Sequence, residues 1–286
     1  MEKHKTILLF VISIVIICVI GITFLNMADD TDYKNNGEYK DQQKPDDEVE
    51  LIEDRSAKYK QAEITQNMKP DFKVGETFEY ERTGNGGNPT SGSIENAKFI
   101  FTVDGIERIN KTEYYIISYV MHSSFMGKDS EGGKVVFEQF WKFKYYINAE
   151  TGKFLKFDKE IQVIHNGLAN PKETTEGRII PEEQQLTYNG LGMYYLWMLY
   201  LDDNFKMETG SGFKKELEVV GMDTLNGRDC FKVEIRTIMT RNNEAKVIRI
   251  EKMWVDKKRR ILLKSEDYED NVKTSVMELV SKITEK

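Results

Sequence analysis

The hydrophobic positions of this chain follow two different patterns. Residues 7–25 form an apolar run without a charged residue. From about residue 72 onward, short segments rich in Val, Ile, Phe, Tyr and Thr are separated by Gly, Asn and Asp. A hydrocarbon core about 30 Å thick needs roughly 20 apolar residues in a helix, so the first pattern predicts a transmembrane helix. The second pattern is typical of an antiparallel sheet.

The charges on either side of the apolar run predict its orientation. Lys3 and Lys5 precede the run, and acidic residues follow it from Asp29. Because a positive flank is retained in the cytoplasm, we expect a cytoplasmic tail at 1–6 and a single-pass anchor at 7–25. The C-terminal domain should then be extracytoplasmic, at the cell membrane. The alternative is a cleaved signal peptide, whose apolar region would be about 7–15 residues and would end at a small-x-small site.

The composition of the remaining chain predicts its domain organisation. Residues 26–70 are polar and acid-rich and lack sustained apolar periodicity, which predicts a flexible stalk. Residues 71–286 are long enough for one all-β domain with its own core. We therefore expect a domain of all-β class, held off the membrane by the stalk.

An internal repeat strengthens the prediction of a sheet. VDGIERINKTEYYIISYV at 103–120 aligns without a gap on VVGMDTLNGRDCFKVEIR at 219–236, which places Asn110 on Asn226. The match resumes where 146–156 aligns on 254–264. Asn and Gly tolerate positive φ, so the shared asparagines mark hairpin turns. We expect duplicated units at about 99–160 and 215–268.

Composition and motifs exclude several classes of function. The net charge of −7 argues against a nucleic-acid surface, which would be basic. The histidines are isolated, no nucleophile elbow is present, and we expect no enzyme, no metal and no cofactor. Carboxylate clusters such as 266–270 leave a carboxylate-dependent hydrolase open as a lesser alternative. Outside the apolar run the only cysteine is Cys230, which is interpreted as a small buried hydrophobe.

Aromatic side chains predict where a ligand would bind. Residues 135–147 carry aromatic residues on both faces of one strand. In a sheet with one solvent-exposed face, apolar and polar residues would alternate along the strand. The apolar segment 191–205 between the repeats predicts a connecting helix. This helix is a plain core helix, a lid over an apolar cavity or a membrane-touching segment. The candidate ligand-binding residues are Phe140, Trp141, Phe143, Tyr194, Tyr195, Trp197, Met198 and Trp254.

The hairpin segments resemble a known family. The pattern FKVGETFEYE, VDGIERINKTEYYIISY and YYINAETGKFLKF recurs as LEVVGMDTLNGRDCFKVEIRT and EKMWVDKKRRILLKSE. These segments are similar to the hairpins of the LolA/LolB-like lipoprotein-carrier superfamily. The resemblance implies a strongly curved, half-closed antiparallel sheet with helices plugging an apolar cavity. It also implies binding of acyl chains or lipidated cargo without catalysis.

We therefore expect an anchored domain that binds an apolar ligand, with membrane lipid or a lipidated protein as partner and no nucleic acid. A structural or protein-interaction module of the cell envelope, without a cavity, is the alternative. Asn110 begins the sequon Asn110-Lys111-Thr112 at a predicted turn, which makes it the candidate glycosylation site.

Overall fold

The computed structural model describes residues 66–84, 94–128, 134–188, 191–209, 214–241 and 244–281. The chain divides into two units, Met1–Lys58 and Tyr59–Lys286, and every described residue belongs to the second. The predicted anchor at 7–25 and nearly all of the predicted stalk lie outside the described residues. Within the described ranges, none of the helical segments has the length and apolarity needed to cross a bilayer.

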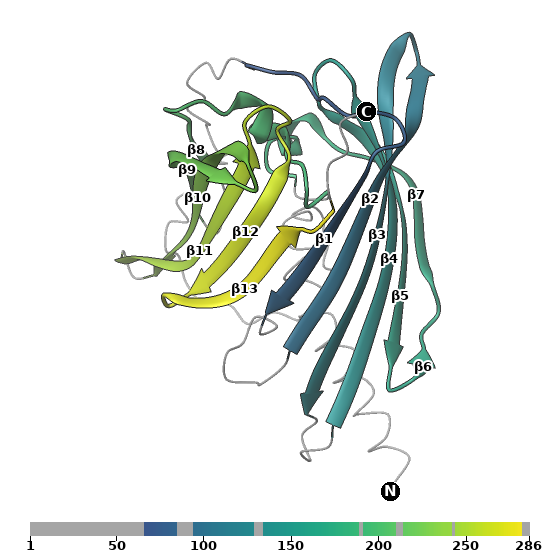
Figure 1. The fold of residues 1–286 in the computed structure, drawn as a ribbon. Helices are drawn as coiled ribbons and strands as arrows, with labels where there is room; N and C mark the ends of the chain where they lie inside the picture. Colours follow the sequence, from purple (N-terminus) through teal and green to yellow (C-terminus); the bar gives the residue numbers. More distant parts are fainter. Residues whose placement is uncertain are drawn as a thin grey trace, which may run out of the picture. The chain divides into compact units, whose positions relative to one another are not determined.

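The described part of the second unit is built on one antiparallel sheet of thirteen strands, which confirms the predicted fold class (Figure 1). The strands are β1 (Thr77–Gly84), β2 (Ile94–Ile109), β3 (Thr112–Lys128), β4 (Lys134–Asn148), β5 (Phe154–His165), β6 (Leu168–Ala169), β7 (Glu173–Ile179), β8 (Lys206–Thr209), β9 (Lys214–Leu225), β10 (Arg228–Arg241), β11 (Glu244–Asp256), β12 (Leu262–Glu269) and β13 (Val272–Leu279).

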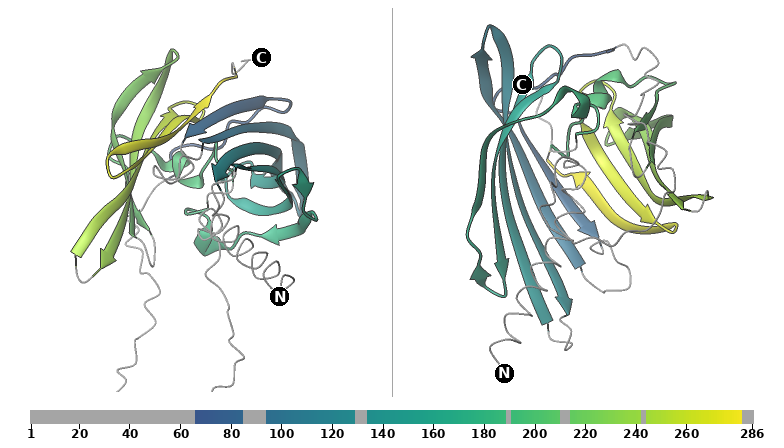
Figure 2. Two further views of the ribbon diagram at one scale, coloured as in Figure 1. Left: turned by 90° about the horizontal axis from the view of Figure 1, so that it is seen from below. Right: turned by 180° about the vertical axis from the view of Figure 1, so that it is seen from behind.

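The sheet has two halves, β1–β7 and β8–β13, and the strand order shows how they are joined. The order is β6-β5-β4-β3-β2-β1-β13-β12-β11-β10-β9-β8, and β7 also pairs with β5. The first strand of the first half is therefore bonded to the last strand of the second half. The other two ends of the halves, β7 and β8, are not paired with each other in the described residues. Seen along the strands, the first half curls into an arc (Figure 2).

The two halves carry the same irregularities at aligned positions. In β2–β3 the register shifts between Val103 and Gly105, and in β9–β10 it shifts beside Gly221, on which Gly105 aligns. A second shift falls between Tyr146 and Ile147 of β4 and at the aligned residues of β11. A β-bulge is a specific local feature, so its recurrence at both places supports the sheet built from two repeats.

Asparagine turns join the strands, as the sequence predicts. Asn110 and Lys111 have φ of 48° and 70°, and Asn226 and Gly227 have φ of 53° and 74°. Positive φ at both central residues defines the type I′ turn, whose twist matches that of the flanking strands. Asn110 is exposed at its turn, and its glycosylation stays a prediction.

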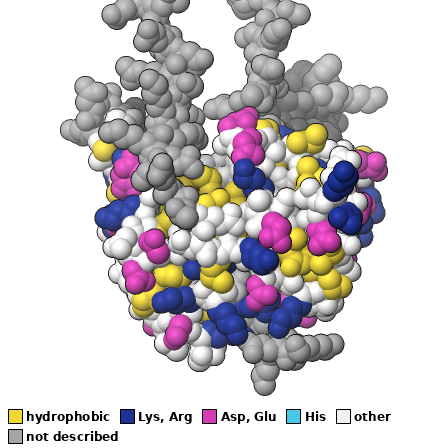
Figure 3. Space-filling model, turned by 90° about the horizontal axis from the view of Figure 1, so that it is seen from above, with side chains coloured by type: hydrophobic (Ala, Val, Ile, Leu, Met, Phe, Trp, Pro, Cys, Tyr) yellow, Lys and Arg dark blue, Asp and Glu magenta, His cyan; other side chains and the backbone are white. Residues whose placement is uncertain are grey.

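The concave face of the sheet holds the main apolar cluster, which includes Phe78, Phe101, Ile117, Tyr145 and residues of all the longer strands. The predicted connecting helix at 191–205 does not form, and only a 3-10 turn, η2 (Leu196–Tyr200), occurs there. A second 3-10 turn is η1 (Glu182–Gln184). The described residues contain no α-helix. On the face that Figure 3 displays, acidic, basic and apolar side chains are interspersed.

Candidate functional site

An apolar segment lies between the unpaired ends of the two halves. Residues 191–201, called the plug below, contribute to the main cluster the buried side chains of Leu191, Met193, Tyr194, Leu196, Trp197, Met198, Leu199 and Leu201. In Figure 1 this green segment lies near the upper end of the sheet, between the two halves. The backbone of the plug is bonded on both sides, since Leu262 donates to the Met193 carbonyl at 2.9 Å and Asn67 donates to the Leu199 carbonyl at 3.2 Å.

The plug docks on the β4–β5 turn of the first repeat through a glycine. Gly152 has φ of 72°, and its carbonyl accepts a hydrogen bond from the Tyr194 hydroxyl at 3.0 Å. A Cβ at this position would collide with Tyr194 and Leu199. Arg260, at the aligned turn of the second repeat, also has positive φ but stacks over Phe231 at 4.7 Å. The absence of a side chain at Gly152 therefore makes room for the plug.

Below the plug, the register of the first half places large apolar side chains in one row across the concave face. The row runs through Ile161, Trp141, Met121, Phe99 and Tyr80 on β5, β4, β3, β2 and β1. Trp141 and Phe143 are only half-buried and pack on the edge of the main cluster. We call this set the aromatic row.

The next row on the same face, two residues further along each strand, is polar. Gln139, Ser123, Ala97 and Arg82 are successive cross-strand partners. Ser123 is 1% exposed, and its Oγ forms no hydrogen bond in the described structure. Trp141 lies diagonally across from Ser123, and its buried Nε1 also has no partner there. We call this set the polar row.

The second half of the concave face carries a group of charged side chains. Arg249 donates to Asp267 Oδ1 through Nε at 3.1 Å and through Nη2 at 2.6 Å. Ser275 donates to the other oxygen, Oδ2, at 2.6 Å, and Arg82 Nη2 lies 3.5 Å from it. Glu251 is the direct cross-strand partner of Asp267. Both oxygens of Asp267 are thus engaged.

The two carboxyl groups of this pair have opposite pKa shifts. Burial opposes ionisation of Asp267, but the positive charges of Arg249 and Arg82 and the hydrogen bonds from Ser275 and Arg249 outweigh it and lower its pKa. Burial and the neighbouring Asp267 raise the pKa of Glu251 more than nearby cations lower it. Asp267 is therefore a fixed anion, and Glu251 takes up a proton more readily than an exposed glutamate.

The structure places six of the eight predicted ligand-binding residues together. Trp141, Phe143, Tyr194, Tyr195, Trp197 and Met198 all belong to or pack against the main cluster. Phe140 and Trp254 lie on the opposite face of the sheet, so the structure does not bring them together with the other six. Phe140 stacks on His122, and Trp254 packs with Cys230 and Leu263 and donates to Asp223 at 2.9 Å.

The reason for this separation is the two-residue period of a strand. Phe140 is adjacent to Trp141 in β4, so their side chains point to opposite faces. Four residues of the concave face were not singled out from the sequence as site residues, namely Arg82, Ser123, Arg249 and Glu251. Ser123 faces the same side as Met121, the cross-strand partner of Trp141, because side chains two residues apart share a face. This relation could be used only once the strand register was known.

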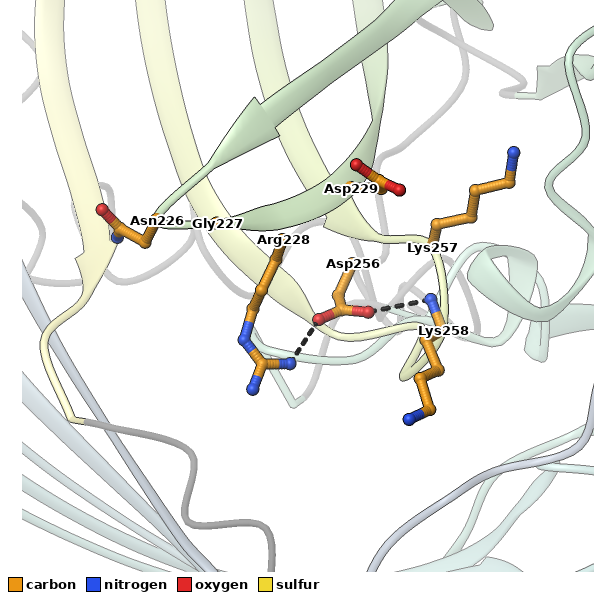
Figure 4. Close-up of a pocket in the computed structure, with 7 residues that line it drawn as sticks. All are labelled: Asn226, Gly227, Arg228, Asp229, Asp256, Lys257 and Lys258. Atoms are coloured by element: carbon orange, nitrogen blue, oxygen red, sulfur yellow. Dashed lines mark hydrogen bonds and ion pairs between the residues drawn. The ribbon is translucent and has the colours of Figure 1, made fainter.

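A separate hollow of about 710 Å³ lies at the turns of the second repeat (Figure 4). It is lined by Asn226, Gly227, Arg228, Asp229, Asp256, Lys257 and Lys258. Figure 4 shows Arg228 directed at Asp256, with Nη1 and Oδ2 2.8 Å apart. Asp256 Oδ1 accepts from the backbone of Lys258 and Arg259, so its carboxylate stabilises the turn. No group of residues suited to a metal ion occurs within the described ranges.

The fold and the concave face define an all-β domain with a curved, open sheet and an apolar plug. Models of protein families give no match to the chain. A comparison with curated proteins gives no match either.

Solved structures similar to this chain include three bacterial proteins. A β-barrel-like protein of a domain of unknown function, DUF1849, from Brucella abortus has a TM-score of 0.41 and 10% identity, covering 73% of this chain and 96% of that one. An exported protein with a YmcC-like fold from Bacteroides fragilis has a TM-score of 0.32 and 12% identity, covering 74% and 97%. An outer membrane lipoprotein-sorting protein domain from Vibrio parahaemolyticus has a TM-score of 0.20 and 10% identity, covering 74% and 86%. With TM-scores this low, these likenesses carry no conclusion about function.

Proposed function

We propose that the domain binds an amphiphilic ligand, such as an acyl chain or a lipidated protein, on the concave face of its sheet. The observation that carries this proposal is a difference between the two repeats. Trp141, Phe143 and Ile161 of the first half align on Arg249, Glu251 and Glu269 of the second half. The first half therefore contributes most of the apolar surface, with Lys159, whose side chain is 10% exposed, as a cation beside Phe143, and the second half contributes charged groups. The interior thus offers both kinds of surface to an amphiphile.

The proposed binding step is displacement of the plug. The plug contains only five residues of 3-10 turn, and it is held by hydrogen bonds to the β4–β5 turn, to the start of β12 and to Asn67. Each methylene that a ligand buries contributes roughly 0.8 kcal/mol, so about ten methylenes contribute roughly 8 kcal/mol. That amount is comparable with the apolar burial given up when a few plug side chains leave the core.

The test is uptake of a fluorescent fatty acid by the purified full chain. Trp197 is a buried plug residue that stacks on Tyr195 and Phe205. Trp197→Ala should change the uptake while the β-sheet circular-dichroism signal remains. Trp254→Ala removes a buried tryptophan from the opposite face and should leave the uptake unchanged. No uptake by the wild-type chain would contradict the proposal.

One observation favours the alternative of a structural or interaction module. Leu191, Met193, Met198 and Leu199 are completely buried in the plug, as in an ordinary core segment. A module of this kind would take up no probe, and Trp197→Ala would only reduce its stability. The uptake experiment therefore separates the two functions.

We also propose that residues 7–25 anchor the chain in the cell membrane, with the domain outside and a stalk at 26–70. The support is the apolar run and its positive N-terminal flank. The full chain should fractionate with membranes and keep residues 1–28. A soluble mature form that starts near Asp29 would show that the segment is a cleaved signal peptide.

A further inference from the structure

Within the part of the chain that the structure describes, two buried hydrogen-bonding atoms on the concave face have no partner. In the described structure, the buried side-chain nitrogen and oxygen atoms without a hydrogen bond are Ser123 Oγ, Trp141 Nε1 and Arg260 Nη1. Buried polar groups are hydrogen-bonded in the great majority of cases, so each exception calls for an explanation. Ser123 and Trp141 are neighbours on one face, which makes them a pair.

The register fixes how close the two side chains are. Ser123 of β3 is opposite Gln139 of β4, and Trp141 is two residues beyond Gln139. Residues in this diagonal relation have backbones about 7–8 Å apart, within reach of an aromatic side chain. Arg82 lies in the same row as Ser123, two strands away across the small side chain of Ala97. Two strand spacings amount to about 10 Å.

The chemistry of these groups specifies what would satisfy them. An indole N–H can only donate a hydrogen bond, and a serine hydroxyl can donate as well as accept. The missing partner must therefore offer an acceptor atom to Trp141. Arg82 in the same row is paired with Asp267 Oδ2 at 3.5 Å, and the positive charge that it adds to this row favours an acceptor that carries negative charge. The apolar neighbours in the aromatic row favour a ligand that also has an aliphatic part.

We propose that Trp141 Nε1 and Ser123 Oγ form a subsite for an acceptor oxygen at the head of the ligand, a carboxylate or a phosphate, whose aliphatic chain lies along the aromatic row. This subsite rests on the proposed function and adds the chemical class of the head group to it. Phenylalanine at position 141 would supply an aromatic ring but no hydrogen-bond donor. The indole N–H is therefore the group that distinguishes a ligand with an acceptor oxygen from a plain alkane.

The first measurement compares three probes of equal length on the full chain in a lipid-free amphipathic polymer. Decanoate, decyl phosphate and decane compete for a bound fluorescent fatty acid. We expect the wild-type chain to favour the two acceptor-bearing probes over decane by about tenfold, as one or two hydrogen bonds allow. The tighter of the two acceptor-bearing probes identifies the head as a carboxylate or a phosphate.

Variants test whether the named atoms produce that preference. Trp141→Phe and Ser123→Ala should each reduce the preference for decanoate over decane to about twofold to threefold while decane binding remains. The matched control is Ser124→Ala, because Ser124 is the next residue of β3 and points to the opposite face. It should keep the wild-type preference.

A spectroscopic measurement reports on the indole directly. In the ¹⁵N-tryptophan-labelled chain, the Trp141 indole signal is the one that Trp141→Phe removes. Decanoate should move this signal downfield, and decane should not. Equal binding of decane and decanoate with an unmoved Trp141 signal would overturn the subsite and leave the proposed function standing. If no probe binds at all, the proposed function fails and the subsite fails with it.

Discussion

Replacing Gly152 by alanine should loosen the plug from the turn on which it docks. The change has two costs. Alanine in the left-handed region at φ of 72° costs roughly 1–2 kcal/mol. The added Cβ also falls against Tyr194 Oη and Leu199 Cδ1, and crowding of a packed core typically costs about 1–3 kcal/mol. The free energy of unfolding should therefore fall by about 2–5 kcal/mol in urea titrations.

Gly167→Ala is the matched control for the backbone cost. Gly167 has φ of 81°, and nothing lies within 4 Å of a Cβ built on it. This variant should lose only about 1–2 kcal/mol, so the difference between the two variants measures the collision with the plug. Equal losses would refute the docking of Tyr194 and Leu199 on Gly152. If the proposed function is right, Gly152→Ala should also take up the fluorescent fatty acid faster.

Four other predictions concern charged or reactive groups. Arg259 is 3% exposed and bonds both oxygens of Glu76, so Arg259→Met should cost about 3–5 kcal/mol in urea unfolding, and adding Glu76→Gln should recover part of it. If the double variant is no more stable than the single one, the buried carboxylate is not the cause. Burial opposes ionisation of Glu266, but its hydrogen bonds and ion pairs outweigh burial and lower its pKa to about 2. Its contribution to stability is therefore complete above its ordinary pKa of 4.5 and is lost as pH falls toward 2, and Glu266→Gln should flatten this part of the pH profile. Glu251 has a raised pKa, so it reduces stability as pH rises above 4.5, and Glu251→Gln should stabilise the chain at pH 7 but not at pH 4. A stabilising effect that is equal at both pH values would contradict this sign. Burial raises the pKa of Cys230 to about 11, so its thiol in a Cys18→Ser chain should resist alkylation at pH 8 until urea unfolds the protein.

Much of the fold could be predicted because its signals are local. Asn110 and Asn226 mark turns through their own backbone preferences, and the glycines on which the repeats align fall beside bulges in both halves. The strand-forming segments could be predicted from their composition, because they are rich in Val, Ile, Phe, Tyr and Thr. The predicted helix at 191–205 was wrong, because the apolar side chains there are held by contacts within the main cluster rather than on one face of a helix.

The candidate site could be predicted only in part because it depends on register. A shift of one residue along a strand moves a side chain from the interior to the opposite face of the sheet, and this is what separates Trp141 from Phe140. Likewise, Trp254 and Met253 are adjacent in β11, but only Met253 belongs to the main cluster. The pairing of Asp267 with Glu251 and Arg249 joins residues of two strands, which sequence order does not reveal. Ser123 carries no sequence signal, since what distinguishes it is a buried Oγ without a hydrogen bond in the described structure.

The pairing of β1 with β13 has a consequence for how the chain folds. Most neighbouring strands are joined by short hairpins, which form early because their ends are close in the chain. The β1–β13 ladder instead joins segments about 200 residues apart, as in the bond from Glu79 N to Ser281 Oγ across 202 positions. Each half can thus form as a local meander, and the slow event is their joining. A circular permutant that connects β13 to β1 and opens the chain between η1 and the plug would turn this distant ladder into a hairpin. Such a chain should fold faster at nearly unchanged stability.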